Sequence, residues 1–365
     1  MKILLICPTT GQIINFRKTL IEKLQSEGHE IYTIAFDEVN RAIIESRNVK
    51  HFCVGGSNRN LNPLKILRLK SQYVRIINQI QPDIVFTFML KPNIFGVLAA
   101  RKAKVKNIFS MVEGAGDVFT NRGFKWKIIR YVVCKLYAKS LKYSKKVFFL
   151  NQDDKNEFIS RKLVKEAQCI VIPGIGVDID HFAFKPVKNY KTFLMVARMV
   201  KAKGVIEYCK AARIVKQQYP DAVFNYLGEE WTMKISDIQE YIDDGSINYL
   251  GTTRDVRPFL EDVLLLLLLS SYREGMPMAI MEAEAVGRGI ITSNSVGCKD
   301  TVIDGYNGFL VECGDYEAMA EKIIWCIEHP IEAEQFGINS RKLAEKKFDS
   351  RLINNTIYSN IFIEQ

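Results

Sequence analysis

The feature that most constrains the fold is an alternation of short apolar runs with longer segments of helical spacing. In the first half of the chain, the runs at 3–6, 30–35, 84–88, 107–111 and 147–150 read as strands. The segments at 16–26, 66–80 and 94–104 repeat apolar residues every three or four positions, as helices do. Strands that alternate with helices of about ten or more residues predict βαβ units and a parallel sheet.

The same pattern restarts in the second half of the chain. Strand-like runs occur at 192–196, 222–227, 247–250, 264–269, 289–292 and 308–311, and helical segments occur at 204–218, 255–261, 277–287 and 316–328. A length of 365 residues suits two domains of about 150–200 residues. We therefore predict an α/β protein of two Rossmann-like parallel-sheet domains that face a cleft. The first domain spans residues 1–186 and the second residues 187–349, and residues 350–365 form a C-terminal helix that can cross back to the first domain.

Cysteine and histidine usage indicates a reduced environment without a metal. The eight cysteines are scattered without a C-x-x-C pair, and the four histidines lack ligand spacing. We expect free thiols in a cytoplasmic protein and no bound metal. The D-x-D pattern at Asp178 and Asp180 lies in the predicted linker, where turn and cap roles suffice. The apolar run at 263–269 has seven residues, whereas a membrane span needs about 20, so we expect a buried strand there.

Charge is divided unevenly between the halves. Residues 1–186 carry 31 Lys and Arg against 15 Asp and Glu, whereas residues 187–365 carry 20 against 26. This asymmetry predicts that one domain meets an extended anionic partner.

Thirteen of these cations lie in residues 101–146, where they are interleaved with aromatic residues along a predicted helix. A basic helix with aromatic residues can lie in a membrane interface, and the residues expected to face the membrane are Lys125, Trp126, Lys127 and Arg130. A helix packed on its sheet with a solvated basic face explains the same pattern. Nucleic acid is the rival partner, but no recognised binding motif accompanies the charge.

The most informative segment runs from 271 to 283. A buried strand ends before it, a turn with Gly275 and Met276 follows, and Pro277 suits the first position of a helix. The free N–H groups and the positive dipole end at this helix start predict a diphosphate site. Glu274 in the turn and Glu282 in the helix are expected to face one cleft, where two carboxylates suit the hydroxyls of two sugars. A loop carboxylate plus an unrelated solvated helix carboxylate explains the spacing equally well.

A second cationic loop follows the first strand of the second domain. It contains Arg198 and Lys203, followed by Gly204. Ligands of open α/β sheets bind at the carboxyl ends of strands. There the Arg acts as a planar fork and the Lys as a point charge on a diphosphate leaving group. Cationic loops are common, so this segment alone is a weak signal.

Together these segments resemble the retaining family 4 glycosyltransferases, which have the GT-B fold. The resemblance rests on the E-x7-E pair Glu274 and Glu282, the loop from Arg198 to Gly204, the stretch 297–308 and the linker 173–182. The N-terminal half, through 91–96 and 112–116, is similar to bacterial transferases that extend undecaprenyl-diphosphate-linked saccharides. N-acetylgalactosaminyltransferases of N-glycan assembly are among these transferases.

The resemblance implies a role for individual residues. Arg198 and Lys203 would bind the donor diphosphate, Glu274 the transferred sugar, and Glu282 the ribose, while Gly11 would let the backbone approach the donor phosphates or the acceptor. Gly275, Met276 and Pro277 would form the turn that cradles the donor. Lys91, Asn93 and Glu113 are candidates on the acceptor side, although a structural role suits Glu113 equally well.

The chain departs from many relatives at three places. Gly11 is followed by Gln12 where relatives often have a second glycine, and Leu265 lies near a position that is often acidic. The stretch 88–91 has no histidine, so no catalytic histidine is predicted.

The implied reaction moves a hexose, such as an N-acetylhexosamine, from a UDP-sugar to a polyprenyl-diphosphate-linked saccharide with retention at the anomeric carbon. The enzyme would act on the cytosolic face of the inner membrane, with no metal or other cofactor. A transferase of capsule or O-antigen synthesis, a UDP-sugar epimerase and a nucleic-acid-binding protein are the alternatives.

Overall fold

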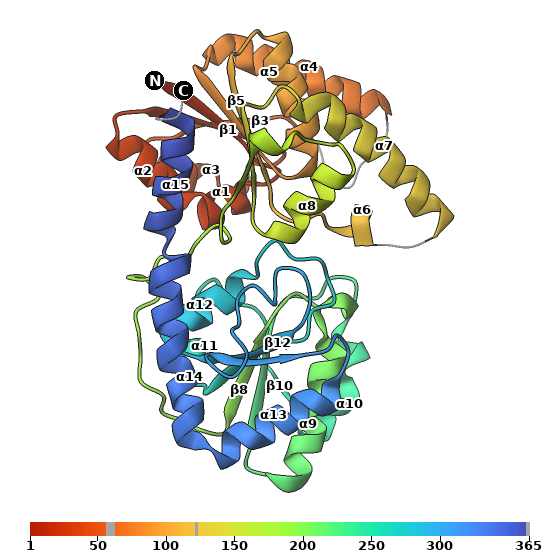
Figure 1. The fold of residues 1–365 in the computed structure, drawn as a ribbon, viewed down its shortest axis with the longest axis vertical. Helices are drawn as coiled ribbons and strands as arrows, with labels where there is room; N and C mark the ends of the chain where they lie inside the picture. Colours follow the sequence, from red (N-terminus) through yellow and green to blue (C-terminus); the bar gives the residue numbers. More distant parts are fainter. Residues whose placement is uncertain (56–62, 121–122, 363–365) are drawn as a thin grey trace. The chain divides into compact units, whose positions relative to one another are not determined.

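The computed structural model describes residues 1–55, 63–120 and 123–362 (Figure 1). It divides the chain into two compact units. The first contains Met1–Ile175 together with Ser350–Gln365, and the second contains Gly176–Asp349.

The first unit is built on a parallel sheet of seven strands in the order β3-β2-β1-β4-β5-β6-β7. The strands are β1 (Lys2–Ile6), β2 (Glu30–Ala35), β3 (Lys50–Cys53), β4 (Ile84–Phe88), β5 (Asn107–Val112), β6 (Lys146–Phe149) and β7 (Cys169–Val171). Each central strand is buried on both faces, as in β1, where Ile3 and Leu5 point to one core and Leu4 and Ile6 to the other. Such strands read as continuous apolar runs, which is why they are visible in the sequence.

Helices cover both faces of this sheet. One face packs against α4 (Pro63–Ile80), α5 (Val97–Lys102), α7 (Phe124–Leu141) and α8 (Gln152–Ser160). The other packs against α1 (Thr10–Phe16), α2 (Lys18–Ser26), α3 (Arg41–Glu45) and α15 (Ser350–Phe362). The remaining turns are η1 (Pro92–Gly96), α6 (Asp117–Thr120) and η2 (Glu166–Gln168). In Figure 1, α15 lies beside α2, so the C-terminal end of the chain packs next to a helix from its N-terminal part.

The second unit has a parallel sheet of six strands in the order β10-β9-β8-β11-β12-β13. The strands are β8 (Thr192–Val196), β9 (Val223–Leu227), β10 (Asn248–Tyr249), β11 (Leu265–Leu268), β12 (Gly289–Ser293) and β13 (Gly308–Val311). Its helices are η3 (Lys201–Lys203), α9 (Val205–Gln218), η4 (Ile235–Asp237), α10 (Gln239–Asp243), α11 (Arg257–Leu260), α12 (Met278–Val286), α13 (Tyr316–Glu328), α14 (Pro330–Leu343) and η5 (Ala344–Phe348). In both sheets the strand order reverses beside the first strand, which is the doubly wound Rossmann arrangement.

The two parallel sheets confirm the predicted α/β class. Two expected helices are interrupted, however. The segment 16–26 belongs to α1 and α2, which are separated at Arg17 because that residue leaves helical geometry (φ −118°, ψ 0°) and turns its side chain into the core. The segment 94–104 divides into the wide turn η1 and the short helix α5.

The division between the units lies at Ile175 and Gly176, N-terminal to the seam expected at residue 186. Backbone hydrogen bonds of the linker explain why the division lies before the expected seam. The Val177 N–H donates to the Phe348 carbonyl at 2.8 Å, and the Lys185 N–H donates to the Val286 carbonyl at 3.0 Å. Residues 176–186 are therefore fastened to the second unit. The helix α15 belongs to the first unit, where Asn354 Nδ2 donates to Thr19 Oγ1 at 3.0 Å.

Candidate functional site

The predicted donor residues lie at the carboxyl edge of the second sheet. The loop with Arg198 and Lys203 follows β8, and the turn with Glu274 follows β11. Because β8 and β11 are neighbours at the reversal of strand order, these loops meet at the place where open α/β sheets bind ligands.

Lys203 and Glu274 form an ion pair across the two loops. Their side chains are only 17% and 12% exposed, and Glu274 Oε1 also accepts a hydrogen bond from Ser270 Oγ at 3.0 Å. The pair depends on a close approach at Gly204. This glycine has φ +80°, and a Cβ there would clash with the backbone of Leu269. Only glycine lets the cationic loop rest on the end of β11.

Arg198 reaches the same edge by a different route. Its side chain is exposed, and its guanidinium carbon lies 4.9 Å from the centre of the Trp231 ring. The Met199 N–H donates to the Glu229 carbonyl at 2.8 Å, and the Met233 N–H donates to the Met199 carbonyl at 3.0 Å. These bonds fasten the loop after β9 to the loop after β8.

The sequence interpretation missed Trp231. A signal was present, because Gly228 directly follows a strand and is followed closely by a tryptophan, one of three in the chain. The structure shows why the glycine is needed: a Cβ at Gly228 would clash with the Ala197 carbonyl.

Glu282 lies in the second turn of α12 and is partly buried. Burial raises the pKa of its carboxyl to about 8. In the described part of the chain, no group forms a hydrogen bond or an ion pair with this carboxyl. A polar ligand could supply the missing partner, since a buried polar group is normally hydrogen-bonded.

The turn before α12 is buried at Gly275, Met276 and Pro277. Pro277 was expected as the first helical residue, but it precedes the helix as its cap because its ψ of 116° is extended. The loop after β12 packs on this turn: Gly297 has φ +85°, and a Cβ there would lie 2.6 Å from the Glu274 carbonyl oxygen.

A buried acid behind the turn was also missed. Glu284 on α12 is fully buried, and its carboxyl accepts a hydrogen bond from Asn307 Nδ2 at 2.9 Å. Burial raises its pKa well above the usual range. The pair joins the stretch 297–308 to α12.

In the first unit, Gly11 and Lys91 lie near the reversal of strand order between β1 and β4. Gln12 Nε2 donates to Met89 Sδ at 2.6 Å, which links the two loops. Met89 adopts a left-handed conformation (φ 67°), which is uncommon for a residue other than glycine. Lys91 is buried, and this burial lowers its pKa.

The other two acceptor-side candidates are held by the protein itself. Asn93 is fully buried, accepts from Thr87 Oγ1 at 2.7 Å and donates to the Met111 carbonyl at 2.8 Å. Glu113 forms an ion pair with Arg17, whose guanidinium also lies 4.1 Å from the centre of the Phe88 ring. Burial lowers the pKa of Arg17 to about 10, so Glu113 is the counter-ion of a buried cation.

The basic helix is α7, where Lys125 and Lys127 are exposed and Trp126 and Arg130 are partly buried. Its inner face is apolar, with Val133, Tyr137 and Leu141 buried against the sheet. Its outer side carries apolar side chains among the lysines, since Phe124 and Tyr131 are 79% and 65% exposed. The helix therefore has more apolar surface than packing on its own sheet requires.

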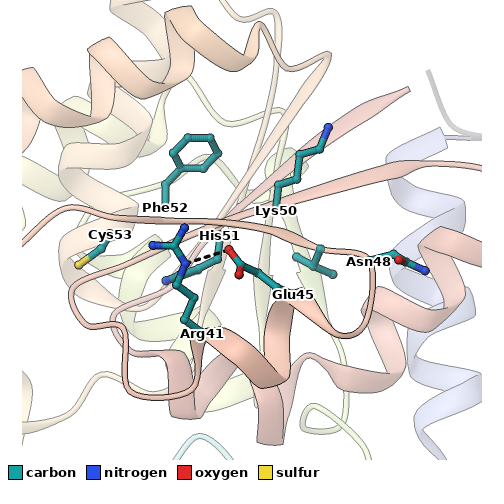
Figure 2. A pocket seen from close by; sticks show the side chains of 8 residues that line it. Arg41, Glu45, Asn48, Lys50, His51, Phe52 and Cys53 are labelled. Atoms are coloured by element: carbon teal, nitrogen blue, oxygen red, sulfur yellow. Dashed lines mark hydrogen bonds and ion pairs between the residues drawn. The ribbon is translucent and has the colours of Figure 1, made fainter.

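A hollow of about 630 Å³ lies along the edge strand β3 (Figure 2). Its charged residues include Arg41 and Glu45, which pair with each other at 2.8 Å. His51 hydrogen-bonds through Nδ1 with Thr33 Oγ1 at 2.9 Å. These side chains stabilise one another.

Within the described ranges, no cluster of three or more His, Cys, Asp or Glu residues could hold a metal. Asp178 of the D-x-D pattern accepts backbone N–H bonds from Asp180 at 3.2 Å and His181 at 3.0 Å, which is the turn role that was expected. Of the helices in these ranges, none is both long enough and apolar enough to cross a membrane.

Comparison with protein families and known proteins gives a consistent result. Residues 2–151 match the family model "Glycosyl transferase 4-like", and residues 176–343 match "Glycosyl transferases group 1". One relative is the N,N'-diacetylbacillosaminyl-diphospho-undecaprenol alpha-1,3-N-acetylgalactosaminyltransferase of Campylobacter jejuni, 26% identical over 360 residues that cover 94% of this chain and 93% of the relative. Another is the UDP-Gal:alpha-D-GlcNAc-diphosphoundecaprenol alpha-1,3-galactosyltransferase of Escherichia coli, 28% identical over 76% of this chain and 74% of the relative.

A solved structure resembles the whole chain. Anabaena HepE in complex with UDP-glucose superimposes with a TM-score of 0.80 at 19% identity, over 99% of both chains. At this identity the likeness shows the shared fold and nothing more.

Proposed function

The chain belongs to the glycosyltransferases, with a glycosyl transferase 4-like domain before a group 1 domain, and from this premise we propose a donor and an acceptor. The donor is a UDP-sugar, with an N-acetylhexosamine such as N-acetylgalactosamine as the transferred hexose. The acceptor is an undecaprenyl-diphosphate-linked saccharide. Two relatives are transferases named for undecaprenyl-diphosphate-linked saccharides, which supports this acceptor, and the name of the second includes the donor UDP-Gal.

The observation that carries the donor assignment is the Lys203–Glu274 pair at the carboxyl edge of the second sheet. A donor brings the two kinds of group that this pair can bind: a diphosphate for the lysine and sugar hydroxyls for the carboxylate. Arg198 adds a second cation for the diphosphate, and Glu282 offers its unmatched carboxyl to the ribose. Backbone N–H groups at the start of α12 complete the diphosphate site.

We propose transfer with retention at the anomeric carbon, as the resemblance to retaining family 4 glycosyltransferases implies. The bond from this carbon to the UDP oxygen breaks, and the acceptor oxygen bonds to the same face. The acceptor proton passes to the departing phosphate oxygen, and UDP leaves. Arg198 and Lys203 stabilise the charge that develops on the leaving diphosphate, so the protein contributes positioning and electrostatics. We propose that no metal takes part, because two cationic side chains fill that role.

The acceptor is anchored in a membrane by its polyprenyl chain. We propose that the first unit meets the anionic cytosolic face of the inner membrane through α7, with Lys125, Trp126, Lys127 and Arg130 at the contact. Exposed Phe124 and Tyr131 on the same helix support this contact, since aromatic and basic residues together favour a membrane interface.

Release of UDP tests the proposal. The purified protein is given a set of UDP-sugars, with and without a polyprenyl-diphosphate-linked saccharide. We expect UDP release that requires the acceptor, and one preferred donor. Interconversion of UDP-sugars without an acceptor would identify an epimerase, and release with a capsule precursor alone would replace the proposed acceptor.

A further inference from the structure

A hollow of about 600 Å³ lies in the first unit between α7 and the segment after α8. Five of its nine lining residues are cations: Lys127, Arg130, Lys135, Arg161 and Lys162. None of the lining residues is acidic. Two of the cations, Arg161 and Lys162, lie outside α7, so the positive charge is gathered from two separate elements.

Local structure holds part of this cluster in place. Arg161 Nε donates to Glu157 Oε1 at 2.6 Å, and its guanidinium lies 5.5 Å from the centre of the Phe119 ring. Lys162 has a left-handed backbone (φ 56°), where its N–H donates to the Ile159 carbonyl at 2.8 Å. Glycine is the residue that usually occupies this position at the end of a helix. A lysine in this left-handed conformation is therefore less favourable for the backbone than a glycine would be.

Few acidic side chains neutralise the positive charge of this cluster. Glu157, which pairs with Arg161, lies beside the hollow, near Cys134. The ammonium groups of Lys127, Lys135 and Lys162 have no acidic partner within residues 1–55, 63–120 and 123–362. Like charges at close range repel, which a bound anion would relieve.

Exposed apolar side chains adjoin the hollow on the same helix. Phe124, Ile128 and Val132 recur at helical spacing and are exposed, and Tyr131 lines the hollow itself. In Figure 1 the N-terminal part of α7 projects away from the sheet of its unit. A phospholipid presents both matching chemistries, an anionic phosphate and an apolar layer directly beneath it.

We propose that this hollow binds the phosphate of an anionic phospholipid headgroup, while the exposed apolar residues of α7 enter the membrane interface. The inference rests on the proposed function in one respect, namely that the acceptor is membrane-anchored. It goes further by assigning a discrete lipid site to Lys135, Arg161 and Lys162.

Vesicle binding of the full chain tests the site with a matched pair of variants. Lys135→Gln with Lys162→Gly removes two cations from the hollow, and the glycine suits the left-handed backbone, so the fold should persist. Lys102→Gln with Lys106→Gln removes two exposed cations elsewhere in the first unit. Binding is measured to phosphatidylcholine vesicles with and without phosphatidylglycerol.

We expect the wild type to bind only the vesicles with phosphatidylglycerol. The hollow variant should bind them about 25-fold more weakly, since each cation near the surface contributes about fivefold. The control variant should bind much more tightly than the hollow variant. Equal losses in the two variants would show that only total charge matters and would overturn the site. Phosphate binding that the hollow variant loses, without vesicle binding by the wild type, would assign the hollow to a soluble anion and also overturn it.

Transfer to a short soluble acceptor analogue separates this inference from the proposed function. Both variants should retain it. A wild type that binds vesicles through the hollow but transfers to no acceptor would refute the proposed function and leave the lipid site intact.

Discussion

The guanidinium of Arg198 lies over the ring of Trp231, with 4.9 Å between the guanidinium carbon and the ring centre. The two residues come from different loops at the carboxyl edge of the second sheet. Stacking on an aromatic face orients the planar guanidinium and contributes about 0.5–1 kcal/mol at an exposed site. Trp231 is therefore a positioning residue for a cation of the proposed diphosphate site.

We expect Trp231→Ala to weaken UDP binding about two- to fivefold, while Trp231→Phe retains most of the affinity because it keeps an aromatic face. Titration calorimetry with UDP measures both. Arg198→Ala should cost more, about 1.5–3 kcal/mol, because it removes a charged hydrogen-bond donor.

A double-mutant cycle identifies how Trp231 acts. If the ring works through Arg198, then Trp231→Ala should have no further effect in an Arg198→Ala background. Additive losses would show that the ring contacts the nucleotide directly.

The Lys203–Glu274 pair predicts opposite effects for its two members. Lys203→Ala should weaken UDP binding, because it removes a charge on the diphosphate and leaves Glu274 to repel it. Glu274→Gln should lower turnover, because the transferred sugar loses a charged acceptor, yet UDP should bind as well as before or better. Turnover and UDP affinity are measured for both variants. Weaker UDP binding by Glu274→Gln together with normal turnover would contradict the assigned roles.

The central strands and the two-unit organisation could be predicted from the sequence, because those strands are covered on both faces and are continuous apolar runs. The edge strands β3 and β7 were missed, because they are short and only partly buried. The segment from Leu265 to Glu282 was equally readable, since a buried strand, a tight turn and a helix follow one another without interruption. Local sequence order sets these features.

Side-chain partners from distant segments could not be predicted. Arg17 was expected on a helix, where an arginine is usually exposed, but it is buried against Phe88 and Glu113. Trp231 meets Arg198 only because β8 and β9 are neighbours in the sheet. Both contacts depend on which strands are neighbours in the sheet, and the spacing of apolar residues does not predict strand order.

The buried Arg17–Glu113 pair predicts a large stability effect. Glu113→Gln leaves Arg17 buried without a counter-ion, and breaking such a pair costs about 3–5 kcal/mol. Chemical denaturation of the variant measures the loss. Arg17→Met combined with Glu113→Gln should recover much of it, because no buried charge remains. A Glu113→Gln variant that is as stable as wild type but transfers poorly would instead place Glu113 at the acceptor.

Glu282 predicts a pH dependence of stability in the protein without nucleotide. Its folded pKa of about 8 lies above the ordinary value of 4.5. The unfolded chain therefore releases this proton at lower pH, and the free energy of unfolding should fall as pH rises from about 4.5 to 8. Glu282→Gln cannot ionise, so it should match wild type below about pH 4 and be more stable above pH 8, by at most about 5 kcal/mol.

Thermal unfolding across this range measures the difference. Glu284→Gln is an unsuitable control because that residue is hydrogen-bonded to Asn307, whereas Glu317→Gln changes an exposed carboxyl in the first turn of α13. Parallel stability curves for wild type and Glu282→Gln would show that the carboxyl is solvated in the folded protein.

A substitution at Gly11 can distinguish a glycine that the fold requires from a glycine that a bound ligand requires. It lies in the first turn of α1, and a Cβ there would meet only Thr9 Oγ1, at 3.8 Å. Nothing in the described protein requires a glycine at this position, and its φ is not in the left-handed region. Gly11→Ala should therefore raise stability by about 0.5–1 kcal/mol, because alanine loses less backbone entropy in a helix. Transfer should nevertheless fall if the donor phosphates or the acceptor approach this backbone, and Lys91→Met serves as a second probe of the same strand reversal. Full activity in a stabilised Gly11→Ala variant would show that this turn does not contact a ligand. Lost activity together with a raised melting temperature would show that a ligand occupies the space that the methyl group fills.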